Sequence, residues 1–144
     1  AYSMAGNQWR TGGKIYPDLI AATRAALMAT GKPYVIENVP GAPLVNPVKL
    51  NGAFFGLNLR RTRLFETTWN LSQPLLPSEP PSYFRMGRRA KSPGDPCMPV
   101  GHFSGVARAR EIMGIDWMNR GELAQALPPA YCEWLGRQLI AAIR

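Results

Sequence analysis

The chain has few of the residues on which disulfide-rich, metal-binding and membrane-spanning proteins depend. Its 144 residues include two cysteines, Cys97 and Cys132, and a single histidine, His102. The cysteines form no Cys-x-x-Cys pair, so the sequence predicts neither a disulfide framework nor a zinc site. No apolar run approaches the roughly 20 residues that span a bilayer, and the N-terminus lacks the charged start and apolar stretch of a signal peptide. We therefore expect a cytoplasmic protein with no metal and no membrane partner.

Acidic residues are also scarce. The chain has 9 Asp and Glu against 17 Lys and Arg, which gives a formal net charge of +8. A strongly basic chain favours a polyanionic partner, and nucleic acid is the first candidate. A membrane surface is the rival, but no basic amphipathic helix stands out. Because many small basic proteins bind nothing specific, charge alone leaves the partner open.

The first regular elements follow an αβ rhythm. Pro17-Asp18 opens a predicted helix, and Gly31 is its natural stop. The apolar run Tyr34-Val35-Ile36 then predicts a buried strand that ends at Glu37-Asn38. The helix face expected to be buried comprises Leu19, Thr23, Ala26, Leu27 and Thr30. This order is typical of the α/β doubly wound sheet, in which ligands bind beyond the carboxyl ends of the strands.

The second half of the chain is predicted to hold one more strand and three helices. The strand covers residues 64–69, and a long irregular segment rich in proline and basic residues follows from 72 to 99. One helix is expected over 104–113. A second begins at Asn119, with Glu122 completing a capping box, and the last begins at Pro128-Pro129. The apolar stripe of the last helix comprises Tyr131, Trp134, Leu135, Leu139 and Ile143.

Glu37 is the first candidate for chemistry because it directly follows a predicted buried strand. Its neighbours Val35, Ile36 and Val39 are apolar. A carboxyl group with little water around it can hold or share a proton near neutrality, which suits an aromatic ring nitrogen that needs protonation. The alternative is a glutamate at a strand end that caps a neighbouring loop.

Arg61 and Arg63 form a second candidate group, just before the second predicted strand. Side chains alternate with period two along an extended chain, so both guanidinium groups should point to one side. Together they would make a fork for a phosphate or a base carbonyl. The alternative is a solvated basic turn.

A third candidate group lies in the irregular segment, where basic residues stand beside Tyr83 and Phe84. Such a mixture suits a loop that tracks a nucleic-acid backbone, although a solvated charge run is the alternative. His102 lies nearby with no second metal ligand, and we interpret it as a hydrogen-bonded structural residue or a DNA contact. The candidate DNA-binding residues are Arg85, Arg88, Arg89, Lys91 and His102.

Three runs together resemble the cytosine-5 DNA methyltransferases, especially the short members found in phages and their hosts. Residues 34–40, Tyr-Val-Ile-Glu-Asn-Val-Pro, resemble the family's Glu-Asn-Val motif. Residues 61–66 resemble its Arg-x-Arg motif before a strand, and residues 122–131 resemble the closing motif of phage-type members. The runs occur in the family's order, with Gly52-x-x-Phe55-Gly56-Leu57 between the first two. The resemblance covers most of the chain.

The resemblance implies a partial doubly wound, Rossmann-like methyltransferase sheet with a long irregular recognition segment. It also implies transfer of a methyl group from S-adenosylmethionine to carbon 5 of a cytosine flipped out of DNA. Glu37 would protonate or hydrogen-bond the ring nitrogen N3, and Asn38 would hold the loop. Arg63 would bind the base carbonyl O2, and Arg61 a phosphate near the flipped nucleotide.

The same resemblance implies a division of the chain. Residues 1–71 would be the C-terminal part of the catalytic domain, 72–104 a small target-recognition segment, and 105–144 helices that return to the catalytic domain. The closing motif packs against the cofactor site in the family. Gln125, Ala126 and Pro128 are therefore the cofactor-binding candidates.

The sequence also departs from the family's pattern. It contains no Gly-rich cofactor loop after a strand, and no Pro-Cys-Gln nucleophile motif before Glu37. Ala1-Tyr2-Ser3 looks like the residues that directly follow such a motif. Pro96-Cys97 has the right dipeptide but lies after Glu37, so we interpret it as coincidental, and Cys132 as structural. Leu59 stands where the family often has a glutamine.

We therefore expect a fragment, or one half of a split DNA cytosine-5 methyltransferase of a bacterial or phage restriction-modification type, inactive by itself. An incomplete sheet exposes an edge, so a complementary subunit or a homodimer is expected. One alternative is a non-catalytic DNA-binding module derived from such an enzyme. The other is an inhibitor that binds proteins and carries the basic loop as decoration.

Overall fold

The computed structural model describes residues 17–74 and 94–144. The chain divides into two compact units. The first contains residues up to Lys49 together with Arg63–Gln73, and the second contains Leu50–Thr62 together with the chain from Pro74 onward. The predicted segment 1–71 therefore contributes to both units. None of the helices in the described ranges is long and apolar enough to cross a membrane.

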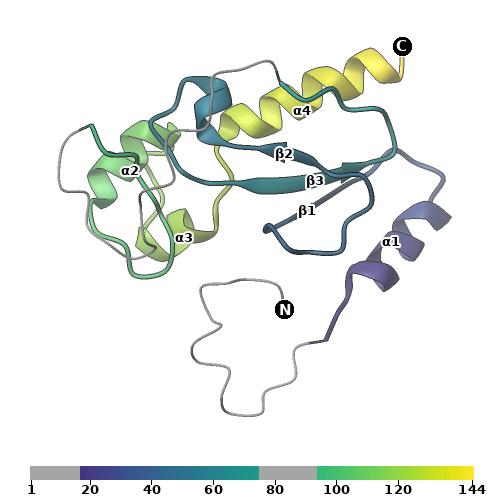
Figure 1. The fold of residues 1–144 in the computed structure, drawn as a ribbon, viewed down its shortest axis with the longest axis horizontal. Helices are drawn as coiled ribbons and strands as arrows, with labels where there is room; N and C mark the ends of the chain where they lie inside the picture. The colour runs from purple at the N-terminus through teal and green to yellow at the C-terminus, as the bar shows by residue number, and fades with distance from the viewer. Residues whose placement is uncertain (1–16, 75–93) are drawn as a thin grey trace. The chain divides into compact units, whose positions relative to one another are not determined.

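A small antiparallel sheet dominates the first unit, so the fold is mixed α/β. Its strands are β1 (Val35–Asn38), β2 (Val48–Leu50) and β3 (Arg63–Thr67), in the order β1-β3-β2 (Figure 1). The last strand in sequence thus lies between the two earlier ones. A doubly wound, Rossmann-like sheet stays a prediction, because these three strands neither contain nor exclude its parallel part.

The register of β1 and β3 sorts their side chains onto two faces. Glu37 pairs with Phe65, and Ile36 pairs with Glu66. Because side chains alternate along a strand, Glu37 shares a face with Phe65, and Ile36 shares the other face with Glu66. The prediction that β1 is buried throughout is wrong: Ile36 is buried, but Val35 is 40% exposed.

Helix α1 (Ile20–Ala29) lies where the sequence predicts a helix, although it begins at Ile20, after the predicted opening at Pro17-Asp18. The Asp18 carboxylate accepts a hydrogen bond from the Ile20 amide, and Gly31 ends the segment with φ +64°. The predicted apolar face is wrong, however. Within the helix only Ile20 is buried, and Leu19 at the N-cap is 61% exposed. Apolar burial therefore contributes little to holding α1 in place. The helix is held mainly by the contact of Arg24 with Glu66 of β3.

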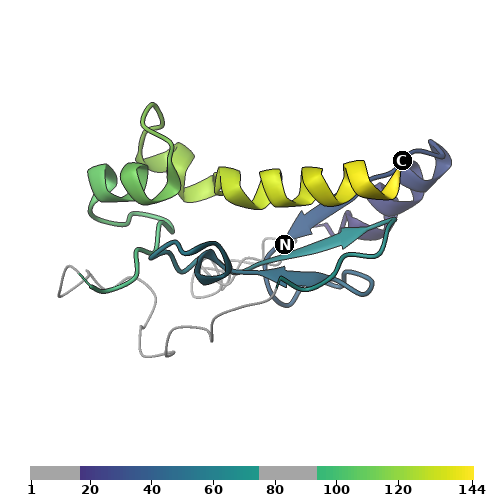
Figure 2. The ribbon, with the colours of Figure 1, turned by 90° about the horizontal axis from the view of Figure 1, so that it is seen from above.

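The second unit contains the short helix η2 (Gly52–Phe55) and the helices α2 (Val106–Met113), α3 (Arg120–Gln125) and α4 (Pro129–Ala142). Figure 2 shows α4 running on from the end of α3, away from α2. The loop before β3 joins this unit through the bridge between Leu59 and Cys97. Its core cluster comprises Leu59, Cys97, Phe103, Ala109, Met113, Ile115 and Leu123.

Two features of these helices confirm the sequence patterns. The Asn119 side chain accepts from the Glu122 amide, and the Glu122 carboxylate accepts from the Asn119 amide, which completes the predicted capping box of α3. In α4, Tyr131 and Leu135 of the predicted stripe are buried. The stripe ends early, because Ile143 is 63% exposed.

Gly52 is required by a close approach of two backbone segments. A β-carbon at this position would lie 2.3 Å from the Leu59 carbonyl oxygen and 2.7 Å from the Leu59 β-carbon. Both distances are shorter than real side chains allow, and a backbone carbonyl cannot move aside cheaply. The first glycine of the Gly52-x-x-Phe55-Gly56 run is thus required because no larger residue fits beside Leu59.

We expect Gly52→Ala to lower the free energy of unfolding by about 2–3 kcal/mol, because the added methyl group overpacks this contact. Gly136→Ala is the matched control, since an added β-carbon there meets nothing within 4 Å. In the middle of α4 that change should stabilise the protein by about 0.5–1 kcal/mol. Urea unfolding measures both. Equal effects of the two substitutions would contradict this role of Gly52.

Candidate functional site

The structure brings Glu37 and Arg63 into direct contact, whereas the base-binding roles that the resemblance implies need room for a pyrimidine between the two side chains. Glu37 lies opposite Phe65, so Arg63, two residues before Phe65, is its diagonal neighbour on the same face of the sheet. The Arg63 Nε atom is 2.9 Å from the Glu37 Oε1 atom. The side chains are 15% and 34% exposed, respectively. Glu37 is thus a solvent-accessible carboxylate with a cationic partner, and not the dry carboxyl group that its apolar neighbours in sequence indicate.

Asn38 acts on the backbone that leaves β1. Its side-chain oxygen accepts a hydrogen bond from the Val39 amide at 2.9 Å. Local contacts of this kind let asparagine replace a strand's hydrogen bonds with a turn. The side chain thus fixes the direction of the chain immediately after Glu37.

Arg61 lies elsewhere, and the expectation that it joins Arg63 in a fork for phosphate needs correction. Arg61 is 2% exposed. Its guanidinium donates to the Pro99 carbonyl at 2.8 Å and to the Ala124 carbonyl at 2.9 Å, both in the second unit. Arg61 precedes β3, which begins at Arg63, so the alternation of a strand does not extend to it. The Arg61 side chain thus links its own loop to the Pro99 segment and to α3.

Tyr131 completes this buried arrangement. Its hydroxyl group donates to the Arg61 carbonyl at 2.8 Å, and the residue is fully buried in α4. Its ring lies 5.0 Å from that of Phe55, in a tilted arrangement. Both the side chain and the backbone of Arg61 therefore connect the loop before β3 to the helical part of the second unit.

The three cofactor candidates lie at the junction of α3 and α4. Gln125 is the last residue of α3 and is exposed, Ala126 is half-buried, and Pro128 is buried at the N-cap of α4. Arg61 binds the Ala124 carbonyl directly beside them. Gln125 is thus the single exposed polar side chain of the three.

The candidate recognition residues Arg85, Arg88, Arg89 and Lys91 lie outside the described residues. His102 is described, and it is exposed in the loop before α2. In the described ranges, no three His, Cys, Asp or Glu side chains gather into a group that could hold a metal ion.

Cys97 does not have the surroundings of a nucleophile. Cys97 is buried, and burial raises the pKa of its thiol, against a smaller opposing effect of the Arg108 charge. The thiolate form is therefore disfavoured, which agrees with interpreting Pro96-Cys97 as coincidental. Cys132 is exposed on α4, so it does not belong to the buried core.

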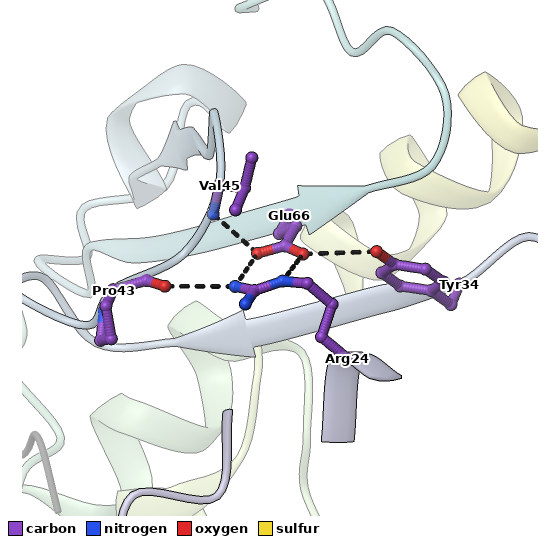
Figure 3. A network of polar contacts seen from close by, with 5 residues as sticks. All are labelled: Arg24, Tyr34, Pro43, Val45 and Glu66. Carbon is purple, nitrogen blue, oxygen red and sulfur yellow. Dashed lines mark hydrogen bonds and ion pairs between the residues drawn. The ribbon is translucent and has the colours of Figure 1, made fainter. Parts of the chain in front are cut away.

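Sequence reasoning missed the contact between Arg24 and Glu66 (Figure 3). The Arg24 guanidinium donates from Nε and Nη2 to the two Glu66 oxygens at 2.6 and 2.7 Å. Glu66 is 3% exposed on β3, and Arg24 extends from α1. One signal was available: Glu66 follows Leu64-Phe65 in a strand, where an acidic residue needs a partner. No sequence pattern singles out Arg24 as that partner among the 17 Lys and Arg residues.

The surroundings of Glu66 favour its charged form. The hydrogen bonds from Arg24 hold the pKa of Glu66 below its ordinary value of 4.5, and the Val45 amide acts in the same direction, while burial opposes both. The same contact raises the pKa of Arg24. Glu66 therefore stays ionised through the neutral range.

Comparison with known proteins finds no matching family, no similar curated protein and no similar solved structure.

We expect Arg61→Lys to lower the free energy of unfolding by about 2 kcal/mol, because an ammonium group cannot satisfy the Pro99 and Ala124 carbonyls with the same geometry. Arg137→Lys, at an exposed position of α4, should change it by less than about 0.5 kcal/mol. Chemical denaturation provides the measurement. Unchanged stability with weaker DNA binding would restore the phosphate-binding role of Arg61.

The contribution of Glu66 to stability should depend on pH. Because its pKa is lower in the folded chain than in the unfolded chain, the stabilisation is complete above the unfolded value and is lost as the pH falls toward the folded value. The stability difference between the wild type and Glu66→Gln should thus be constant above about pH 6 and shrink below about pH 4.5. Thermal unfolding across this range measures it. A difference that grows on acidification would contradict this account.

Proposed function

We propose that this chain forms the base-binding side of an S-adenosylmethionine-dependent DNA cytosine-5 methyltransferase. The observation that carries the proposal is the 2.9 Å contact between Arg63 and Glu37 on one face of the β1–β3 pair. The two residues come from the runs that resemble the Glu-Asn-Val and Arg-x-Arg motifs. They are 26 positions apart in sequence, and their meeting is what the base-binding role requires.

The chemistry of the pair suits the edge of a cytosine. N3 and O2 are adjacent acceptors on that edge, and a carboxyl group that has taken up a proton from solvent and a guanidinium group would match them in order. Proton donation to N3 by Glu37 draws electrons toward the ring nitrogen, so that carbon 6 becomes open to attack by a thiolate. Arg63 at O2 stabilises the negative charge that develops on the base.

The ion pair also prepares the site before a base enters. Each side chain holds the other in place, so less side-chain freedom is lost on binding. The 34% exposure of Glu37 leaves a path for a ring to reach its carboxylate. A base that binds there would replace part of the contact with Arg63 by its own hydrogen bonds.

The chain's own residues supply only part of such an enzyme. S-adenosylmethionine would supply the methyl group, but among its three candidate contacts only Gln125 offers an exposed polar side chain. The described residues at the α3–α4 junction do not by themselves make a cofactor site. Cys97 is not a ready source of the thiolate, since it is buried and its pKa is raised. The proposal therefore assigns base binding, and not the whole reaction, to these residues.

A second candidate function is a DNA-binding module without catalysis. The net charge of +8 favours it, because phosphate contacts supply most non-specific DNA affinity. Such a module would bind duplex DNA in a salt-dependent manner, and S-adenosylmethionine would not change its affinity. It would need neither Glu37 nor Arg63 in contact with a base.

Complementation tests the proposal. The chain would be mixed with a segment of a short cytosine-5 methyltransferase that carries the Pro-Cys-Gln motif and the Gly-rich loop, and transfer of labelled methyl groups to duplex DNA would be measured. We expect transfer by the mixture and none by this chain alone. Glu37→Gln should lower kcat about 10²–10⁴-fold, because it removes the proton that N3 receives. Arg137→Gln, at an exposed position of α4, is the matched control and should leave kcat unchanged.

Each other outcome counts against the proposal. Transfer that survives Glu37→Gln would refute the role of this carboxylate. Salt-dependent DNA binding without complementation, and without any response to S-adenosylmethionine, would favour the DNA-binding module. If the chain binds no duplex at low salt, both functions fail, and the protein-binding inhibitor becomes the better interpretation.

A further inference from the structure

Glu66 is the most fully used carboxylate among the described residues whose contacts are known. It accepts from Arg24 Nε and Nη2 at 2.6 and 2.7 Å, from the Val45 amide at 2.7 Å, and from the Tyr34 hydroxyl at a longer 3.4 Å. A buried carboxylate with a shifted pKa is often a catalytic candidate. Here protein donors occupy both oxygens, so Glu66 is not placed to exchange protons with a ligand.

The contacts of Glu66 converge on the segment that follows Asn38. Residues 39–47 connect β1 to β2. Glu66 binds this segment at the Val45 amide, and Arg24 donates from Nη2 to the Pro43 carbonyl at 3.1 Å (Figure 3). Figure 3 shows Arg24 lying between the Pro43 backbone and Glu66, so one ion pair fixes the segment at two points.

The segment itself is short and internally bonded. The Ala42 amide donates to the Val39 carbonyl, and the Leu44 amide donates to the Ala42 carbonyl. Ala42 is buried. Because the turn is closed in this way, fixing Pro43 and Val45 also fixes Val39, and with it the end of β1.

The register carries this constraint to the candidate site. Glu66 lies opposite Ile36, the residue before Glu37, on the face of the sheet away from Arg63. The backbone is therefore constrained both before and after Glu37. Ile36, before it, pairs with Glu66 of β3, and Asn38 and Val39, after it, lead into the segment that Glu66 holds. Displacements of about 1 Å at a reacting group can cost about 10²-fold in rate, so such support has functional consequences.

We propose that Arg24 and Glu66 are positioning residues of the Glu37–Arg63 site. They hold residues 39–47 so that Glu37 keeps its place beside Arg63. This inference rests on the proposed function for its biological meaning. The structural coupling it asserts can nevertheless be measured on the 144-residue chain without any methyl transfer.

The test uses the Arg63 Nε–H group as a reporter. In the ¹⁵N-labelled chain, its resonance and its exchange with solvent report the contact with Glu37, and Glu37→Ala sets the change for complete loss of that contact. We expect Glu66→Gln to move the resonance toward the Glu37→Ala position and to accelerate exchange about tenfold. Arg24→Lys keeps the charge but not both hydrogen bonds, so it should give a smaller change in the same direction.

Two control variants separate positioning from general loss of stability. Ile20→Val removes one carbon from the buried residue of α1 and leaves every polar contact of Glu66 in place. Tyr34→Phe removes only the longest of those contacts. Compared at equal distance below their melting temperatures, both should leave the Arg63 resonance and exchange near wild-type values.

The outcomes distinguish this inference from the proposed function. It is overturned if Glu66→Gln and Arg24→Lys leave Arg63 unchanged, or if Ile20→Val changes it as much as they do. If Glu66→Gln does not fold, the comparison of the Arg63 resonance and exchange between Arg24→Lys and Ile20→Val decides the question. If complementation restores methyl transfer but the Arg63 resonance does not respond to Glu66→Gln or Arg24→Lys, the positioning role is refuted and base binding stands. If the Arg63 resonance responds but complementation gives no transfer, the coupling is supported and the proposed function is refuted.

Discussion

The antiparallel register of β1 and β3 is the constraint on which the candidate site depends. With Glu37 opposite Phe65 and Ile36 opposite Glu66, two carboxylates that belong to neighbouring strands face opposite sides of one sheet. A shift of one residue would exchange the faces, so that Glu37 would lose Arg63 and Glu66 would lose Arg24. Both ion pairs therefore stabilise the same register. Burial of Ile36 and Phe65 on the two faces acts in the same direction.

The two carboxylates show how surroundings divide their roles. Glu66 is 3% exposed and is bound by a guanidinium group, an amide and a hydroxyl group, so its charge is useful only for holding the chain. Within the described part of the chain, Glu37 has one cationic partner, at 2.9 Å, and its side chain is 34% exposed. A carboxyl group that is both paired and accessible can exchange one partner for a ligand at low cost. One that is fully bonded and buried would first have to leave several donors unsatisfied.

Several elements could be predicted from sequence because their signals are local. The capping box at Asn119 and Glu122 and the stop at Gly31 follow from spacing and turn chemistry. The failures are non-local. Arg61 was assigned by strand alternation, but the strand begins two residues later, and its partners lie at positions 99 and 124. Nothing in a linear pattern distinguishes an arginine that binds phosphate from one that binds two backbone carbonyls.

Arg24 and Arg61 together show why a basic composition overstates the charge available to a ligand. Each guanidinium donates to backbone carbonyls inside its own unit, Arg24 to Pro43 and Arg61 to Pro99 and Ala124. The planar group with five donors is suited to such use, because it satisfies several acceptors in loops that lack regular hydrogen bonding. A chain rich in proline and irregular segments has many such carbonyls. Part of the excess of arginine is thus explained by the fold, and only the remainder can contribute to binding a polyanion.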